Sequence, residues 1–415
     1  MPDLFMDIIS GRLMDVAKLV KDSMKAGGDI DLKPLLKPLN RVRDIHGVAA
    51  VDGGLQEVRL SNGHVLALSR AIAVNDMGYE PVRVGDVRIY PESSIGGLLL
   101  MAKLEFEAAL RALKSYDGVK AILMDGSLYV KLTNALHTLV KGIGIGDVYS
   151  SYEAYEVVEL ASRLFNEASK RGVSIIYVSK DSGLRIIKER AILSMLKDYG
   201  GLGEVVDVGL RSYSVLWVSK LRSMILKESL RARGRVRRLM ELLLNQAIND
   251  SVMLWEASRG LKEPHYTRPL TIGLRYDVRF RNLTVGDITR AASARLRSLN
   301  SIRGIKVEFS EDALLSLPKV TLTYVLPKAG DLPMLIEKPA EGGFLEEPAI
   351  VEGGFIEDDL GLIVGGYVDE ARYNPLLALA HVYARFTEDQ LMEYLTILGE
   401  LLGVGLARRI GMIFL

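Results

Sequence analysis

The chain has 415 residues, of which 49% are hydrophobic, and its 53 Lys and Arg residues nearly balance its 52 Asp and Glu residues; such a chain can bury a large core, in one elaborated domain or in two to three ordinary ones. It contains no cysteine, which excludes disulfide bonds and thiolate metal sites and leaves oxygen and imidazole ligands, the set that favours Mg²⁺ or Mn²⁺. No apolar stretch approaches the roughly 20 residues of a membrane span, and the N-terminus lacks the basic start of a secretory signal, so we expect a cytoplasmic protein with no membrane segment.

Helical signals dominate the first 45 residues. Apolar residues recur at helical spacing from Phe5 to Lys25, and a Gly-Gly pair and a Pro-containing segment follow. This pattern predicts a helix that ends before the glycines. Residues 1–45 are therefore predicted to form an N-terminal helical arm, and residues 46–415 to form the main domain.

An alternation of apolar and polar residues begins at Val48 and predicts a three-strand antiparallel meander. The Ser-Asn-Gly sequence at residues 61–63 is a hairpin-turn signal. Because Asp52 is followed by two glycines, it is placed at the first turn of the meander. The predicted strands are Val48–Val51, Leu55–Leu60 and Val65–Val74.

A helix and a further strand follow the meander. The Leu- and Ala-rich segment from Ser94 to Ser115 predicts a helix, and the apolar run Ala121–Met124 predicts a strand that ends at Asp125. Three antiparallel strands, a helix and a strand that ends in Asp follow one another in the order of the ribonuclease-H-like fold. We therefore predict an α/β fold with a ribonuclease-H-like mixed sheet flanked by helices.

The rest of the chain alternates between helices and strands, except in residues 211–310. Within that range the segment Lys220–Arg238 carries eight Lys and Arg residues against one acid, which indicates either a phosphate-facing surface or a solvated helix face. Residues 211–310 are predicted to be a helical insertion. The other predicted elements are helices Tyr152–Arg171, Leu184–Tyr199 and Pro375–Leu402, strands Val173–Ser179, Val320–Leu326 and Met334–Glu337, and a Gly- and Glu-rich loop Glu341–Gly354.

Two apolar strands that each end in Asp-Gly are the main functional signal, and they deliver Asp52 and Asp125. Taken singly, each is typical of a turn aspartate that accepts hydrogen bonds from its own backbone. Adjacent strand ends would bring both carboxylates together, however, and clustered like charges require a cation. The pair therefore predicts a metal site.

The helix between these strands carries two acids, Glu105 and Glu107. Residues two apart lie on different faces of a helix, so only one of them faces the aspartates. The other is an ordinary solvated acid. Glu105 is the preferred candidate, and the choice between the two stays open at this point.

Tyr373 and His381 stand near the start of the predicted terminal helix, where Pro375 is a favoured first-turn residue. Both side chains are in reach of one cleft. Two roles are open for His381, as a metal ligand or in acid–base transfer.

These motifs, taken in order, resemble those of the archaeal NurA nucleases. The resemblance spans about residues 45 to 390. The shared motifs are Asp52-Gly-Gly, Leu-Glu105 on a helix, Met-Asp125-Gly-Ser-Leu, Ser-Lys180-Asp, and Tyr373 and His381 before an Ala-Arg helix sequence.

The resemblance implies roles for these residues. Tyr373 would lie near the scissile phosphate, and Lys180 matches the family's Ser-Lys strand end. Two Mn²⁺ or Mg²⁺ ions are expected as cofactors. The implied metal ligands are Asp52, Asp125, His381 and either Glu105 or Glu107.

The resemblance also implies an activity and partners. Family members degrade DNA with 5′ to 3′ exonuclease and single-strand endonuclease activity. They work as homodimers with the hexameric HerA helicase-translocase in DNA end resection, a step of double-strand-break repair by homologous recombination. The expected partners are therefore DNA, a HerA-type ATPase and a second copy of the chain.

Two-metal chemistry would suit these residues. One ion lowers the pKa of a bound water toward neutrality, and a second stabilises the departing 3′ oxygen, with Asp52 bridging both. Lys180 would balance developing phosphate charge. The basic residues from Arg231 to Arg238 would hold the DNA backbone in a salt-sensitive way that does not depend on base sequence.

Two other functions compete with this interpretation. Actin-like or sugar-kinase-like phosphotransferases also use Asp-Gly hairpins, but no second strand–Asp-Gly–strand unit follows Asp125 and no Walker-type phosphate loop occurs. A non-catalytic adaptor of a DNA translocase would dock through its N-terminal helix and its apolar C-terminus, Ile410–Leu415. The acids at the strand ends argue against an adaptor, because docking does not require them.

Overall fold

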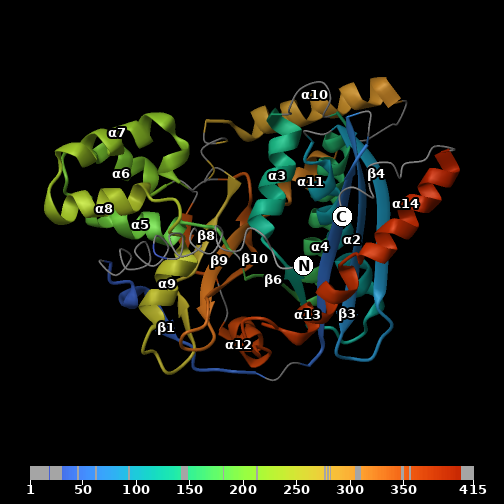
Figure 1. Cartoon of the computed structure of the whole chain (residues 1–415), viewed down its shortest axis with the longest axis horizontal. Coiled ribbons are helices and arrows are strands. Elements are labelled where there is room, and N and C mark those ends of the chain that lie inside the picture. The colour runs from blue at the N-terminus through green and yellow to red at the C-terminus, as the bar shows by residue number, and fades with distance from the viewer. Residues whose placement is uncertain are drawn as a thin grey trace, which may run out of the picture.

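One large mixed sheet with helices on both faces forms the body of the computed structural model (Figure 1). The described residues are 18, 30–43, 46–60, 63–91, 94–141, 148–180, 182–211, 214–274, 277, 280, 282–303, 310–346, 350–354 and 357–402. Apart from Lys18, the predicted helix Phe5–Lys25 lies outside these ranges, as does Ile410–Leu415. Within the described ranges, no helix is both long and apolar enough to span a membrane.

In the described part of the chain, the sheet has eleven strands in the order β1-β7-β9-β10-β6-β5-β2-β3-β4, with β8 pairing β9 and β11 pairing β8. β2, β3 and β4 are antiparallel, whereas β2, β5 and β6 run parallel. The strands are β1 Leu36–Pro38, β2 Val48–Arg59, β3 His64–Asn75, β4 Val82–Pro91, β5 Ala121–Asp125, β6 Ser174–Ser179, β7 His265–Thr267, β8 Leu270–Ile272, β9 Pro318–Leu326, β10 Met334–Gly343 and β11 Ile350–Glu352.

Helices cover both faces of the sheet. One core lies between the sheet and α2, α3 and α4, and a second core lies between the sheet and α12 and α13. The α/β fold with a mixed sheet flanked by helices is confirmed, and its ribonuclease-H-like assignment stays a prediction. The helices are α2 Gly96–Ser115, α3 Leu128–Lys141, α4 Val148–Arg171, α5 Ile186–Met195, α6 Gly203–Gly209, α7 Ser219–Arg231, α8 Gly234–Leu244, α9 Asp250–Ser258, α10 Val285–Arg303, α11 Glu311–Leu315, α12 Glu357–Gly365, α13 Pro375–Ala384 and α14 Glu388–Leu402.

The prediction that Asp52 lies at a turn is wrong. β2 runs without a break through Asp52 and the two glycines, and Asp52 pairs with Ile72 of β3. The first hairpin turn comes later, at Gly63, whose φ of 78° is in the left-handed region. The third strand of the meander is consequently β4, in a segment that was not predicted to be a strand.

The two glycines after Asp52 serve close packing on opposite faces of β2. Successive strand residues point to opposite faces. A Cβ at Gly53 would lie 2.6 Å from Glu105 Oε1 on α2, and a Cβ at Gly54 would overlap the carbonyl oxygen of Ala384 on α13. Helices therefore approach the strand on both sides at this point.

The predicted terminal helix is two helices, α13 and α14. Arg385 adopts an extended conformation after α13. A capping box then starts α14, because Thr387 N–H donates to Gln390 Oε1 at 3.2 Å and Gln390 N–H donates to Thr387 Oγ1 at 3.3 Å. The Thr-Glu-Asp-Gln sequence was the available signal for this break.

Helices α5 to α8 form a lobe at one end of the molecule (Figure 1). A buried polar link joins this lobe to α9. Asp250 accepts the backbone N–H groups of Ile187 and Lys188 at 3.1 and 2.8 Å, which caps the first turn of α5. Burial raises the pKa of Asp250 to about 7.

The predicted insertion, residues 211–310, contains α7 to α10 and also the strands β7 and β8 of the main sheet. The basic stretch that was predicted within it is divided between α7 and α8, which are separated by an extended Ala232. The domain boundaries stay a prediction.

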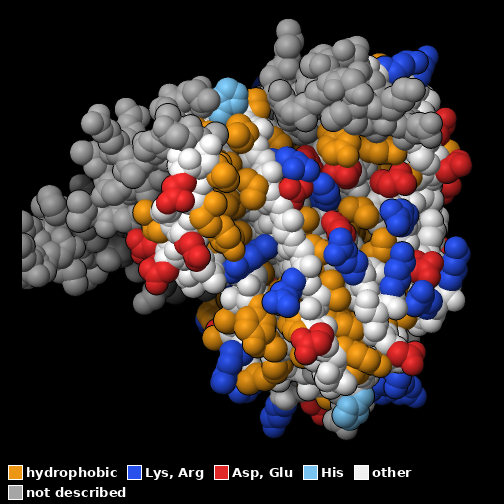
Figure 2. All heavy atoms as spheres, turned by 90° about the vertical axis from the view of Figure 1, so that its right-hand side faces the viewer, with side chains coloured by type: hydrophobic (Ala, Val, Ile, Leu, Met, Phe, Trp, Pro, Cys, Tyr) orange, Lys and Arg blue, Asp and Glu red, His pale blue; other side chains and the backbone are white. Residues whose placement is uncertain are grey.

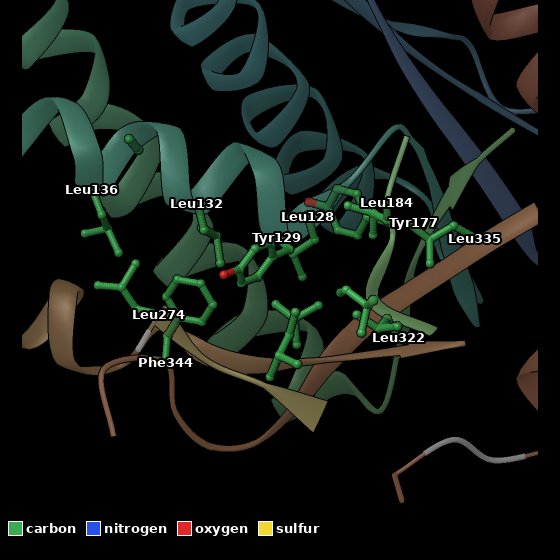
Figure 3. Close-up of a cluster of buried hydrophobic side chains, with 14 of the residues drawn as sticks. Leu128, Tyr129, Leu132, Leu136, Tyr177, Leu184, Leu274, Leu322, Leu335 and Phe344 are labelled. Carbon is green, nitrogen blue, oxygen red and sulfur yellow. The ribbon is translucent and has the colours of Figure 1, made fainter. Parts of the chain in front are cut away.

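Helix α3, which was not predicted, is anchored over the sheet by a buried hydrophobic cluster (Figure 3). Leu128, Leu132 and Leu136 are fully buried. The burial of each side chain stabilises the folded state by roughly 2 kcal/mol relative to an exposed position. Tyr129 meets Phe344 edge-on, with ring centroids 5.9 Å apart. This packing holds the first turn of α3 directly beside the end of β5.

Candidate metal centre

Asp52 and Asp125 come together because β2 and β5 are parallel neighbours. Val51 pairs with Met124, so the residues that follow them in each strand are adjacent. Asp52 is buried within β2. Asp125 ends β5, and the next N–H, of Gly126, donates to Val178 O at 3.0 Å.

His381 reaches this pair from α13 on the same face of the sheet. Its Nδ1 donates to Asp52 Oδ2 at 2.8 Å, with the proton assigned from this contact. Asp52, Asp125 and His381 each offer one ligand atom, and the three atoms lie within 4.8 Å of one another. Asn374 caps α13 by accepting the N–H groups of Leu376 and Leu377, which sets where the helix begins.

Tyr373 and Lys180 border this group. The Tyr373 hydroxyl donates to Asp125 Oδ1 at 3.3 Å. Lys180, just after β6, places its ammonium 4.8 Å from the centroid of the Tyr373 ring, a cation–π contact. Tyr373 therefore contacts Asp125 directly, and Lys180 lies next to Tyr373.

The structure separates the two glutamates of α2. Glu105 is 3% exposed and lies against Gly53, next to Asp52. Glu107 pairs with Arg111 on a more exposed face of the helix. Glu105 is therefore the glutamate of α2 that lies against the strand carrying Asp52, on the opposite face of β2 from His381, and it is outside the group of three ligand atoms within 4.8 Å.

Two further charged residues adjoin the site and were not predicted from the sequence. Lys131 on α3 forms an ion pair with Glu105. Glu337 on β10 accepts the Tyr129 N–H at 3.1 Å and the Ser127 hydroxyl at 3.0 Å, which caps the start of α3. The helical spacing of Leu128, Leu132 and Leu136 was the signal that would have predicted α3.

The acids repel one another in a partly desolvated setting. Burial, and after it the nearby Asp125 carboxylate, raises the pKa of Asp52, while hydrogen bonds from His381 and the Gly53 N–H act in the opposite direction. Burial also raises the pKa of Glu105 to about 7, against the effect of Lys131. Two carboxylates and an imidazole that converge in this way fit a divalent cation with oxygen and nitrogen ligands.

Comparison with known proteins identifies the family. Residues 46–386 match the family model of the NurA domain. The chain belongs to the NurA family. The match covers most of the chain and spans the positions of Asp52, Glu105, Asp125, Tyr373 and His381, so the predicted resemblance to this family is confirmed. No curated protein sequence matches the chain.

Solved NurA structures are similar to this chain over nearly its whole length. The NurA nuclease from Sulfolobus solfataricus is 13% identical with a TM-score of 0.50, over 97% of this chain and 98% of that one. This likeness shows a shared fold. A NurA structure with manganese is 16% identical (TM-score 0.41, 93% and 96% covered), and a NurA bound to dAMP and manganese is also 16% identical (TM-score 0.36, 94% and 95% covered).

Proposed function

We propose that this NurA-family chain is a metal-dependent DNA nuclease that hydrolyses phosphodiester bonds. The observation that carries the proposal is the convergence of Asp52, Asp125 and His381 within 4.8 Å. Membership of the NurA family supports the choice of DNA as substrate. A bound Mn²⁺ or Mg²⁺ would lower the pKa of a coordinated water and neutralise charge on the scissile phosphate.

Each residue of the site has a proposed role in this reaction. Asp52 and Asp125 would hold the ion, and the hydrogen bond to Asp52 orients the His381 imidazole, whose side chain is 50% exposed and open to substrate. Tyr373 fixes the orientation of the Asp125 carboxylate. Lys180 stabilises negative charge on the phosphate. By the family resemblance, the centre would take two ions.

Binding of the DNA backbone is proposed for the basic surface of α7 and α8. Arg222, Lys227, Arg233 and Arg235 are exposed there. Arg231, by contrast, pairs with Glu228. Contacts of this kind release counterions from DNA, so affinity is expected to fall steeply with salt.

The polarity and partners of the family are also proposed for this chain. We infer 5′ to 3′ exonuclease and single-strand endonuclease activity, and a role with a HerA-type ATPase in DNA end resection. Tyr394, Ile397 and Leu401 of α14 are exposed hydrophobic residues at helical spacing, and hydrophobic side chains gather on the face of the molecule that carries α14 (Figure 2). This apolar surface supports an assembly, either a homodimer or a complex with the ATPase.

Cleavage is expected to depend on a divalent metal ion. End-labelled linear duplex and single-stranded DNA are incubated with the protein and Mn²⁺, Mg²⁺ or EDTA, at moderate and high temperature. We expect cleavage with Mn²⁺ or Mg²⁺, its loss in EDTA and its return when Mn²⁺ is added in excess. Comparison of 5′- and 3′-labelled DNA gives the polarity. If the wild type cleaves no DNA with any ion at any temperature, the nuclease proposal is wrong and an adaptor function gains support.

The two glutamates of α2 are expected to respond differently to substitution. Glu105→Gln removes a buried charge beside Asp52, so we expect DNA cleavage to fall by about 10-fold or more. Glu107→Gln alters a surface ion pair with Arg111 and is expected to leave the rate within about 2-fold, because such pairs contribute little. Initial rates under saturating Mn²⁺ compare the two variants. Equal losses in both would contradict the assignment of Glu105 to the centre.

A further inference from the structure

Lys131 lies in the first turn of α3, directly after the strand end that carries Asp125. Its ammonium forms an ion pair with Glu105 Oε2 and donates to the backbone carbonyl of Asp125 at 2.7 Å. The Lys131 side chain is 12% exposed. One nearly buried cation therefore links α2, which carries Glu105, to the end of β5.

Packing determines where this ammonium lies. The ring of Tyr177 faces it, with the centroid 5.3 Å from Nζ. Leu128 and Leu132 anchor α3 in the hydrophobic cluster beneath it (Figure 3). The backbone that carries Lys131 is thus held in place, and the side chain is enclosed by a carboxylate, a carbonyl and an aromatic ring.

Glu105 is held from two sides. Lys131 binds its Oε2, and its Oε1 lies so close to the backbone of β2 that a Cβ at Gly53 would come within 2.6 Å. The carboxylate is therefore held against β2 at Gly53, the residue that follows Asp52. A buried carboxylate that loses its counter-ion either moves or becomes costly to keep charged.

We propose that Lys131 is the positioning residue of Glu105 in the metal centre. Its ammonium keeps the Glu105 carboxylate against β2 at Gly53, next to Asp52 in the strand, where the negative charge of the carboxylate supports the binding of a divalent cation. Lys131 acts through Glu105 and contacts neither the ion nor DNA. The inference rests on the proposed function, because it takes the acidic cluster to be a metal centre.

Removal of Lys131 could change the affinity for a divalent cation in two opposite directions. If only charge mattered, loss of a positive group near the centre would tighten the binding of a divalent cation. If Lys131 positions Glu105, its loss would weaken binding by about 10- to 100-fold, the usual effect of removing a partner of a metal-site residue. The sign of the change in affinity decides between them.

The test measures Mn²⁺ affinity by electron paramagnetic resonance on the full chain without DNA. We expect Lys131→Met to weaken Mn²⁺ binding by at least about 10-fold, and Lys131→Arg to recover part of the loss. Because Lys131 acts through Glu105, Lys131→Met should have little further effect in a Glu105→Gln background. Unchanged or tighter binding in Lys131→Met, or an equal loss in the Glu105→Gln background, would overturn the proposal.

Lys338→Met is the matched control. Lys338 is also a largely buried lysine, and it pairs with Asp359 of α12 on the face of the sheet opposite Lys131, the face that also carries α13. We expect this variant to bind Mn²⁺ like the wild type, which separates positioning from the general loss of a buried ion pair. Circular dichroism checks each fold, and Lys131→Gln replaces Lys131→Met if the latter does not fold.

The outcomes for Lys131 and for the nuclease proposal are distinguishable. If the wild type cleaves DNA and Lys131→Met binds Mn²⁺ like the wild type, only the proposed role of Lys131 is wrong. If the wild type binds Mn²⁺ but cleaves no DNA, and Lys131→Met binds Mn²⁺ more weakly than the wild type, only the proposed nuclease function is wrong.

Discussion

We expect an Asp125→Asn variant to cleave DNA more than about 100-fold more slowly than the wild type. Loss of a residue that contacts a metal ligand, but not the metal itself, already lowers metal affinity or activity by about 10- to 100-fold. Loss of a charged ligand is expected to lower activity further. The amide oxygen of the new side chain would still accept the Tyr373 hydroxyl, and the end of β5 is held by backbone hydrogen bonds. The loss should therefore come from the missing charge and not from unfolding.

Thermal unfolding gives an independent readout of the same variant. Because Asp125 raises the pKa of Asp52 through repulsion, its neutralisation should leave the metal-free protein at least as stable as the wild type. Mn²⁺ should raise the Tm of the wild type by mass action and have little effect on Asp125→Asn. Asp117→Asn, at an exposed position before β5, is the control. An equal Mn²⁺ shift in Asp125→Asn would show that Asp125 is not a ligand.

Gly54→Ala is expected to dislodge α13 from the sheet. A Cβ at Gly54 would overlap the carbonyl oxygen of Ala384, the last residue of α13. That carbonyl is held in place by Arg70, which pairs with Gly54 across β2 and β3 and donates to Ala384 O at 2.9 Å. Because the overlap involves backbone, no change of rotamer relieves it.

We expect Gly54→Ala to lower the free energy of unfolding by about 3 kcal/mol, near the upper end for overpacked cores. Urea unfolding measures this loss, and hydrogen exchange should show reduced protection of α13. Since α13 carries His381, DNA cleavage should fall by about 100-fold, the effect of a displacement of roughly 1 Å.

Gly85→Ala on β4 is the matched control for Gly54→Ala. A Cβ there would lie 3.5 Å from Ser69 O, an ordinary contact. We expect a change in stability within about 0.5 kcal/mol. If Gly54→Ala is as stable as the wild type and α13 keeps its protection from hydrogen exchange, the helix accommodates the methyl group. Gly54 would then not be required for the docking of α13.

Local pattern predicted the elements that carry the acids. The apolar run before Asp125 predicted a strand because such runs are typical of buried strands, and β5 ends at that residue. Pro375 predicted the start of the helix that carries His381, because proline is favoured in a first helical turn. The joint occurrence of Asp52 and Asp125 after apolar runs pointed to a shared site, and the two are neighbours across β2 and β5.

Local pattern failed where distant segments pack together. Asp-Gly-Gly is a turn signal when only its neighbours in the sequence are considered. At Asp52 the glycines instead make room for α2 and α13, and His381 meets Asp52 across 329 residues of chain. Lys131 had no motif around it, because its role arises from a contact with another helix.

Local sequence was enough to predict most core strands and helices, the end of a strand at Asp125, and the acids and histidine that were candidates for a site. These features depend on the periodicity of neighbouring residues and on the chemistry of individual side chains. Contacts between distant segments were needed to establish that Glu105 and not Glu107 lies against β2 next to Asp52, that His381 lies against Asp52, and that Lys131 pairs with Glu105. Each of these depends on how helices pack against the sheet, which no local sequence pattern specifies.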